Sequence, residues 1–158
     1  MKREAVSTSW PEGEGLLGEG LTTLQKAEHL RGLELFSYLT VEELFRLAEI
    51  AGMFKRAAGE VILRENDIAN AFFLVLQGKV TLTSRNEGFR EVIGPQQPFG
   101  LHSVLTQEPL AFTAEAVQDT YALLIGAEDF YNLLSNHPET VVSIFKYFVK
   151  KSGLGPRI

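Results

Sequence analysis

Apolar and polar residues follow two different periods along this chain, and the change between them divides it into three parts. From Leu21 to about Gly52, apolar residues recur every three or four positions, which predicts amphipathic helices. From Gly59 to Gly126 they come instead in short runs separated by turn residues, which is typical of β-strands. Helical spacing then returns and continues to Ser152. The pattern therefore predicts helices on both sides of a strand-rich centre.

Two helices before the strands begin with a complete capping signal. Thr22 is followed three residues later by Gln25, and Thr40 by Glu43, so each pair forms a predicted capping box. We expect the first helix to stop at Gly32, because glycine commonly ends helices. The second helix is predicted to have an apolar face made of Leu44, Leu47, Ala48 and Ala51, with Gly52 as its end.

The centre of the chain contains short apolar runs that predict strands. Turn residues such as Asn66-Asp67, Gly78 and Gly94-Pro95 separate them. Short strands at close spacing, with few long connections, favour an antiparallel barrel or sandwich. The predicted strands are 61–63, 72–76, 80–84, 91–93, 113–117 and 121–125.

The two ends of the chain set the predicted domain limits. Residues 1–20 contain Pro11 and four glycines among charged and small residues, so we interpret them as a flexible linker or tail. Residues 21–152 are predicted to form one domain, and residues 153–158 a C-terminal tail. The last helix is expected to start at Pro138, and its apolar face consists of Val141, Ile144, Phe145, Phe148 and Val149.

Composition and charge narrow the function classes. The 158 residues are 45% hydrophobic and 22% charged, as in an ordinary globular domain. The net charge of -5 disfavours electrostatic binding to nucleic acid or to an anionic membrane. The sequence has no cysteine, which excludes disulfides and a cysteine nucleophile and fits a cytoplasmic location. No window approaches the roughly 18 apolar residues of a membrane span.

Three motifs resemble those of the cyclic-nucleotide-binding domain family. The family opening L-F-x-x-L-x-x-E-x-L-x-x-L-A is matched by residues 35–48. The next signature, G-E-x-I-x-x-E-G-D-x-x-x-x-x-Y-x-I-x-x-G-x-V, is matched over residues 59–80. The family's phosphate-binding cassette, roughly F-G-E-x-A-L-L-x-x-x-P-R-x-A-T, is matched by residues 99–113. The resemblance implies an α+β fold that is mainly β: a jelly-roll-like double-stranded β-helix, or β-roll, of about eight short antiparallel strands, with N-terminal and C-terminal helices.

The cassette keeps the family's frame but lacks its two charged residues. The glutamate that holds the ribose hydroxyl falls on Leu101, and the arginine that clamps the cyclic phosphate falls on Leu110. Leucine supplies neither a charge nor hydrogen-bond donors, so we expect a closed or apolar site with little affinity for cAMP or cGMP. The resemblance implies a ligand pocket lined by Phe99, Gly100, Leu101, His102, Ser103, Val104, Leu110, Ala111, Phe112 and Thr113.

One further departure concerns the turn before the cassette. Asn66 stands where the family has the glycine of its E-G-D turn. Asparagine enters the left-handed backbone region more readily than most residues. We therefore expect the turn to keep its shape.

The remaining chemistry-bearing residues do not predict catalysis. His29, His102 and His137 are far apart and lack the spacing of metal ligands, so we expect no metal and no cofactor. Ser103 follows His102 directly, but no G-x-S-x-G elbow is present, and neighbouring side chains on a helix point apart. We predict no catalytic residue and no enzyme activity.

Three functions remain open at this point. The leading one is a regulatory or interaction module that has lost the usual cyclic-nucleotide contacts. The second is a working sensor of a cyclic nucleotide or another small ligand, which uses backbone amides and a basic side chain such as Arg85 or Arg90. The third is structural assembly, with the apolar faces of the first and last helices pairing two chains into a homodimer.

The resemblance also bears on partners. Such domains are appended to membrane transporters or helical-repeat segments, and the helix over 22–31 running into 33–36 looks like that junction. In transcription regulators of the family a helix-turn-helix follows the last helix, whereas this sequence ends at Ile158. We therefore expect no DNA binding by this chain and no direct membrane insertion.

Overall fold

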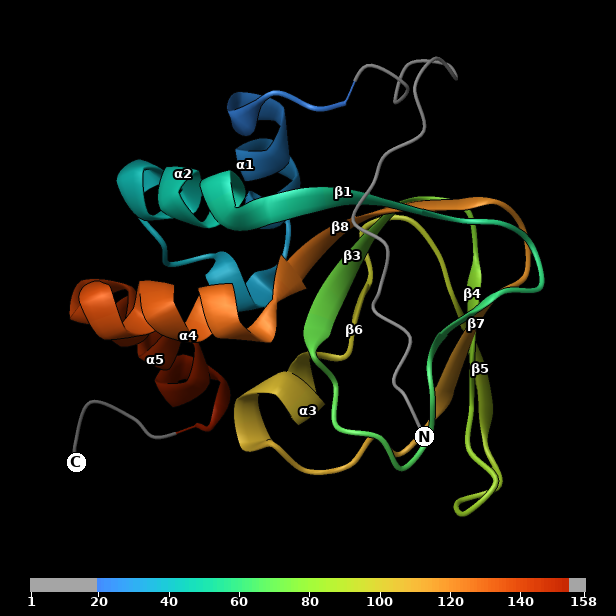
Figure 1. Cartoon of the computed structure of the whole chain (residues 1–158). Coiled ribbons are helices and arrows are strands. Elements are labelled where there is room, and N and C mark those ends of the chain that lie inside the picture. The colour runs from blue at the N-terminus through green and yellow to red at the C-terminus, as the bar shows by residue number, and fades with distance from the viewer. Residues whose placement is uncertain (1–19, 154–158) are drawn as a thin grey trace.

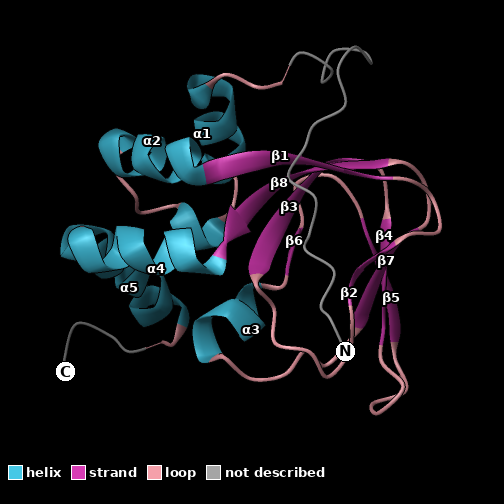
Figure 2. Cartoon of the chain, in the orientation of Figure 1, coloured by secondary structure: helices cyan, strands magenta, loops and turns pink. Residues whose placement is uncertain are grey.

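The structure is a computed structural model that describes residues 20–153 (Figures 1 and 2). The predicted linker over 1–20 and tail over 153–158 lie outside these residues, apart from Gly20 and Gly153. The helices are α1 (Thr23–Arg31), the 3₁₀ helix η1 (Glu34–Phe36), α2 (Val41–Ile50), α3 (Leu101–Thr106), α4 (Ala127–Asn136) and α5 (Pro138–Lys151). The strands are β1 (Ala51–Arg56), β2 (Val61–Leu63), β3 (Ala71–Gln77), β4 (Val80–Thr83), β5 (Arg90–Ile93), β6 (Pro98–Phe99), β7 (Thr113–Ala116) and β8 (Thr120–Gly126).

Both predicted capping boxes are confirmed at the starts of α1 and α2. The Thr22 hydroxyl accepts from the backbone N–H of Gln25 at 3.2 Å, and the Gln25 side chain accepts from the N–H of Thr22 at 2.9 Å. Thr40 and Glu43 form the same reciprocal pair at 3.2 and 2.9 Å. Each box supplies partners to N–H groups that the first helical turn leaves unpaired.

The predicted extent of the second helix was wrong. The helix ends at Ile50, and β1 begins at Ala51 without a connecting loop. Residues 51–56 pair with β8, from Ala51 opposite Ile125 to Arg56 opposite Thr120. Because the hydrogen-bond partners of β1 lie about 70 residues later, local periodicity gave no sign of the change from helix to strand.

The eight strands form two four-stranded sheets in which every pair is antiparallel, as predicted for the β-roll. One sheet has the order β1-β8-β3-β6, and the other the order β2-β7-β4-β5. Figure 1 shows α1, α2, α4 and α5 gathered at the end of the first sheet, with the second sheet on the opposite side of the molecule. The short helix α3 lies below β3 and β6, where the cassette follows β6.

Phenylalanine side chains join the first sheet to the helices. Phe72 of β3 packs edge-to-face on Phe130 of α4, with ring centroids 5.2 Å apart, and also contacts Phe36 of η1 at 6.5 Å. Phe73, whose side chain alternates with that of Phe72, contacts Phe54 of β1 at 4.9 Å. All five rings are less than 2% exposed, so they form one rigid centre that positions the elements around the cassette.

The last helix packs on the domain with a largely polar side. Thr140, Ser143 and Ile144 are its buried residues. Of the five residues of the predicted apolar face, Ile144 is buried and Val141 is half-buried, but Phe145, Phe148 and Val149 are 62%, 46% and 41% exposed. Helical geometry places these exposed side chains, together with Val142, on the side of α5 that faces away from the domain.

Candidate functional site

The cassette begins where β6 meets α3, at a glycine that the backbone requires. Gly100 has φ +88°, in the region that L side chains rarely adopt, and a Cβ there would lie 3.1 Å from the carbonyl oxygen of Ala71. Before it, the Phe99 ring stacks on Phe73 with centroids 4.9 Å apart. The chain is thus fixed against β3 just before the predicted ligand residues.

The two leucines at the family's charged positions are placed differently. Leu110 is 3% exposed and belongs to the hydrophobic core, while Leu101 is half-buried and packs against that core. The backbone of Leu110 is also held on both sides: its N–H donates to the Asp67 carbonyl at 2.7 Å, and its carbonyl accepts from the Asn66 N–H at 2.9 Å. Leu110 is therefore a core residue anchored to the preceding turn.

That turn has the conformation expected from the sequence. Asn66 has φ +74°, so asparagine occupies the left-handed region in place of glycine, as predicted. The turn also contacts the end of the cassette through Glu65, whose backbone N–H donates to the Thr113 hydroxyl at 3.0 Å. The turn thereby holds the last part of the cassette at Leu110 and at Thr113.

The Ser103 hydroxyl is used to hold the cassette together. It donates to the carbonyl of Glu108 at 2.7 Å and accepts from the N–H of Ala69 at 2.9 Å, and Ser103 is 2% exposed. One residue later, the carbonyl of buried Val104 accepts a hydrogen bond from the Tyr131 hydroxyl of α4. These contacts join α3 to the segment just before β3 and to α4.

The other predicted pocket residues lie nearer to solvent. The His102 side chain is 78% exposed, and its Nε2 lies 3.8 Å from Oε2 of Glu108. Ala111 is exposed, and Phe112 and Thr113 are half-buried. The cassette is thus brought together as one unit, but its members range from core to surface.

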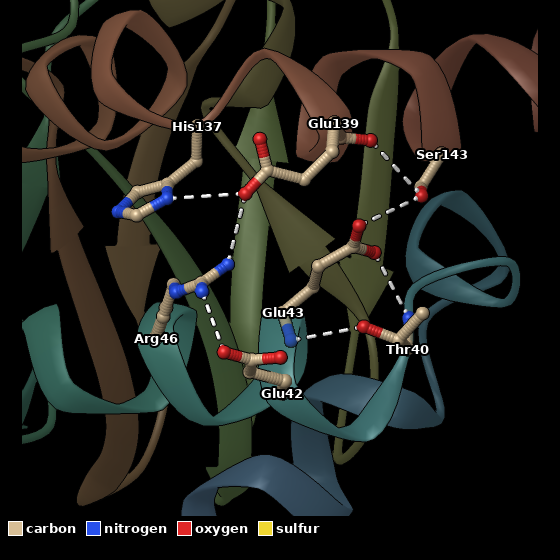
Figure 3. Close-up of polar contacts among 7 residues, drawn as sticks. All are labelled: Thr40, Glu42, Glu43, Arg46, His137, Glu139 and Ser143. Atoms are coloured by element: carbon tan, nitrogen blue, oxygen red, sulfur yellow. Dashed lines mark hydrogen bonds and ion pairs between the residues drawn. The ribbon is translucent and has the colours of Figure 1, made fainter.

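A polar cluster between α2 and α5 was not anticipated from the sequence (Figure 3). The Ser143 hydroxyl donates to Oε1 of Glu43 at 3.1 Å, while Oε2 of Glu43 accepts from the N–H of Thr40. Arg46 connects Glu42 of its own helix, at 2.6 Å, with Glu139 of α5, at 3.0 Å, and His137 Nδ1 lies 3.2 Å from the same Glu139 oxygen. The capping box located Glu43, but nothing local indicated its partner on α5.

Comparison with known families decides the identity of the domain. The family model described as "Cyclic nucleotide-binding domain" matches residues 54–137, which include the turn and the whole cassette. This chain belongs to the cyclic nucleotide-binding domain family.

Known members of the family with similar sequences include a receptor and a channel. The cyclic AMP receptor protein of Thermus thermophilus is 30% identical over 113 residues, which is 69% of this chain and 52% of that protein. A cyclic nucleotide-gated potassium channel of Rhizobium etli is 27% identical over 100 residues, covering 63% of this chain and 28% of the channel. The chain thus spans about half or less of the length of these relatives.

Solved structures support the fold assignment. The N-terminal domain of a transcriptional regulator from Streptomyces coelicolor superposes with a TM-score of 0.68 at 24% identity, covering 78% of this chain and 88% of that one. The predicted jelly-roll-like β-roll with flanking helices is therefore confirmed.

Metal binding and membrane spanning can be checked in the described part of this cyclic nucleotide-binding domain. Among residues 20–153, no group of three or more His, Asp or Glu side chains is placed to hold a metal ion. None of the helices within that range combines the length and apolar character that crossing a bilayer requires.

Proposed function

We propose that this chain is a non-catalytic regulatory or interaction module of the cyclic nucleotide-binding family, whose cassette does not hold cAMP or cGMP through the family's ribose and phosphate contacts. The observation that carries the proposal is the burial of Leu110 in the core at the position of the phosphate-binding arginine. The cassette from Phe99 to Thr113 also contains no lysine or arginine that could replace it.

The energetic consequence of these leucines supports the proposal. A buried cyclic phosphate needs an opposed charge and several donors, which arginine supplies in one planar group. Losing one partner of a buried, hydrogen-bonded charge pair costs about 2 to 5 kcal/mol, or roughly thirty-fold to several-thousand-fold in affinity. A helix as short as α3 does not compensate for this loss, and the His102 side chain is 78% exposed.

The contacts of the cassette with the C-terminal helices support a regulatory role. The hydrogen bond from Tyr131 to the carbonyl of Val104 joins α3 to α4, and α4 leads directly into α5. A ligand shifts such helices only when it binds two of their positions with different affinity. Without the phosphate anchor, we propose that the helices keep one position and present a fixed surface.

Isothermal titration calorimetry with cAMP and with cGMP tests this function. We expect no binding tighter than about 10 μM for either nucleotide, which corresponds to a binding free energy weaker than about 7 kcal/mol. Circular dichroism of the same sample verifies that the protein is folded. Saturable 1:1 binding below that concentration would contradict the proposal and favour the sensor alternative.

The proposal also covers the cellular location and the partners of the module. A cytoplasmic location fits a sequence of 158 residues without cysteine. DNA binding by this chain is not included, because its net charge is -5. We include no insertion into a membrane, although the module fits attachment to a membrane protein or a helical-repeat protein.

We propose homodimerisation through α5 as a second function, on the basis of its exposed apolar side. Val142, Phe145, Phe148 and Val149 are each 41% to 62% exposed and lie on one side of a 14-residue helix. A second copy of the same helix would cover this side. Light scattering coupled to size-exclusion chromatography at two concentrations should show a mass approaching twice 17.6 kDa at the higher one. A monomeric mass at both concentrations would contradict dimerisation.

A further inference from the structure

A pocket of about 480 Å³ lies on the side of the second sheet that faces away from the core. The strand register separates the two sides of this sheet: Leu82 opposite Ala114 is a buried pair, whereas Thr83 opposite Thr113 belongs to the other side. The pocket is thus separated by the sheet from the buried interior of the β-roll. Its lining consists of Val61, Arg64, Glu65, Asn66, Thr83, Arg85, Thr113 and Glu115.

Two guanidinium groups of this pocket have no hydrogen-bonded partner among the described residues. Within residues 20–153, the side chains of Arg64 and Arg85 form neither a hydrogen bond nor an ion pair. Arg90 lies beside them, because β5 places it opposite Thr83 on the same side of the sheet. The lining also contains the carboxylates of Glu65 and Glu115, so what favours an anion here is the unpaired hydrogen-bond donors of the two guanidinium groups.

One carboxylate of the pocket, that of Glu65, holds the loop that carries Arg85. Glu65 accepts hydrogen bonds from the Ser84 hydroxyl at 3.1 Å, the Arg85 N–H at 3.1 Å and the Asn86 N–H at 3.3 Å. The hydrogen bond from the Arg85 backbone is the main cause that lowers the pKa of Glu65, so this group stays ionised. Glu65 therefore holds the backbone of Arg85. The positive charge of Arg85 also contributes to the lowered pKa of Glu65, although the two side chains form no ion pair.

Hydroxyl donors complete the pocket. The Thr83 hydroxyl makes no hydrogen bond among the described residues. The Thr113 hydroxyl accepts from Glu65 N–H, which leaves its own proton free to donate. Glu115 contributes one acceptor that makes no hydrogen bond or ion pair within the described part of the chain.

We propose that this pocket binds a small oxyanion, a phosphate-bearing or carboxylate-bearing metabolite, through Arg64 and Arg85. Planar guanidinium groups match the oxygen pairs of both anions, and Thr83 and Thr113 donate to the remaining oxygens. Glu115 then accepts from a hydroxyl or amine of the same ligand. The volume falls within the usual range for small-molecule pockets of about 300–1,000 Å³. The pocket shares Thr113 with the cassette but lies on the outer side of the sheet, so pyrophosphate and citrate test it separately from the cAMP titration.

Calorimetric titration of the full chain at low salt, with inorganic pyrophosphate and separately with citrate, tests the site. We expect 1:1 binding tighter than about 1 mM for at least one probe, and the better probe identifies which anion is preferred. Arg64→Gln and Arg85→Gln should each weaken it about tenfold or more. Both residues are exposed, so the thermal unfolding of the variants should match that of the wild type.

Arg31→Gln serves as the matched control, because Arg31 is an exposed arginine of α1 outside the pocket. It should leave the affinity unchanged. Absence of saturable binding tighter than about 1 mM for both probes would overturn the proposal. Equal weakening by Arg31→Gln and by the pocket variants would also overturn it, because the attraction would then be a property of the whole surface.

Discussion

The Glu43 carboxylate accepts a hydrogen bond from the Ser143 hydroxyl over 3.1 Å, joining α2 to α5 across 100 residues of sequence. The same carboxylate closes the capping box with Thr40 and is part of a side chain only 4% exposed. One buried carboxylate thus caps the start of α2 and binds α5 through Ser143. This contact lies on the side of α5 that packs on the domain, whereas Phe145 and Phe148 are exposed.

Replacing this carboxylate should destabilise the domain strongly. Glu43→Ala removes the capping box and the acceptor of Ser143 together, and we expect a loss of about 2 to 3 kcal/mol in the free energy of unfolding. Glu42→Ala is the control, because Glu42 is a neighbouring glutamate that is 76% exposed and forms a surface ion pair with Arg46. It should cost less than about 1 kcal/mol. Urea denaturation of both variants measures the difference, and equal losses would contradict the role given to Glu43.

Truncating two adjacent residues of α5 should affect the stability of the domain very differently. Ile144 is 8% exposed and Phe145 is 62% exposed. We expect Ile144→Ala to lower the free energy of unfolding by about 2 to 4 kcal/mol and Phe145→Ala to change it by no more than about 0.5 kcal/mol in the monomer. Thermal unfolding at a low protein concentration measures both. A large loss for Phe145→Ala there would mean that this ring packs within its own chain.

Restoring the family's charged residues should test whether the cassette interior is filled. Leu110→Arg places an unpaired charge in the core, so we expect a loss of at least about 3 kcal/mol in unfolding free energy. Leu101→Glu should cost less, because Leu101 is only half-buried. We expect the double variant to gain no cAMP binding in calorimetry. A gain would show that the cavity is retained and that only the charged groups are missing.

The contact of α5 with η1 should weaken in acid. Hydrogen bonds from Lys151 and Tyr147 hold the pKa of Glu34 below its ordinary value of 4.5. Because the folded state binds this proton less tightly than the unfolded state, the stabilisation is complete above pH 4.5 and is lost as the pH falls through the lowered value. Glu34→Gln should therefore be less stable than the wild type at pH 7, with the difference shrinking below pH 4.5.

Urea midpoints measured between pH 7 and pH 3.5 provide the data for this comparison. Glu28→Gln makes the same chemical change at an exposed position of α1 that has no hydrogen-bond partner within the described residues. Its midpoint should follow that of the wild type throughout. A constant gap between Glu34→Gln and the wild type down to pH 3.5 would exclude the ionised pair as the cause.

Much of the fold could be predicted because its signals are local. Thr22 and Thr40 each meet their capping partner three residues later, and Asn66 adopts the left-handed conformation by virtue of its own side chain. The strand over residues 61–63 could be predicted because a short apolar run between turn residues is recognisable in the sequence without knowledge of the paired strand. The two-residue β6 and the strand β1 were missed, since pairing with distant strands defines them.

The candidate site could likewise be predicted only in part from the sequence. The sequence located the cassette and showed that Leu101 and Leu110 stand at the family's charged positions. It could not show that Leu110 is a core residue, because that depends on where the turn at Asp67 meets the cassette in space. The outer pocket could not be predicted either, since Arg64 follows β2 and Arg85 follows β4, two strands that β7 separates in the sheet.

By itself, the sequence determined where helices begin, where turns reverse the chain and which chemical groups the cassette can offer. Only the tertiary structure decided which side of α5 is buried, because five apolar residues on a helix do not specify the surface that receives them. That surface presents Glu43, whose Oε2 already accepts from the N–H of Thr40, and the hydroxyl of Ser143 donates to Oε1, which a phenylalanine ring could not do.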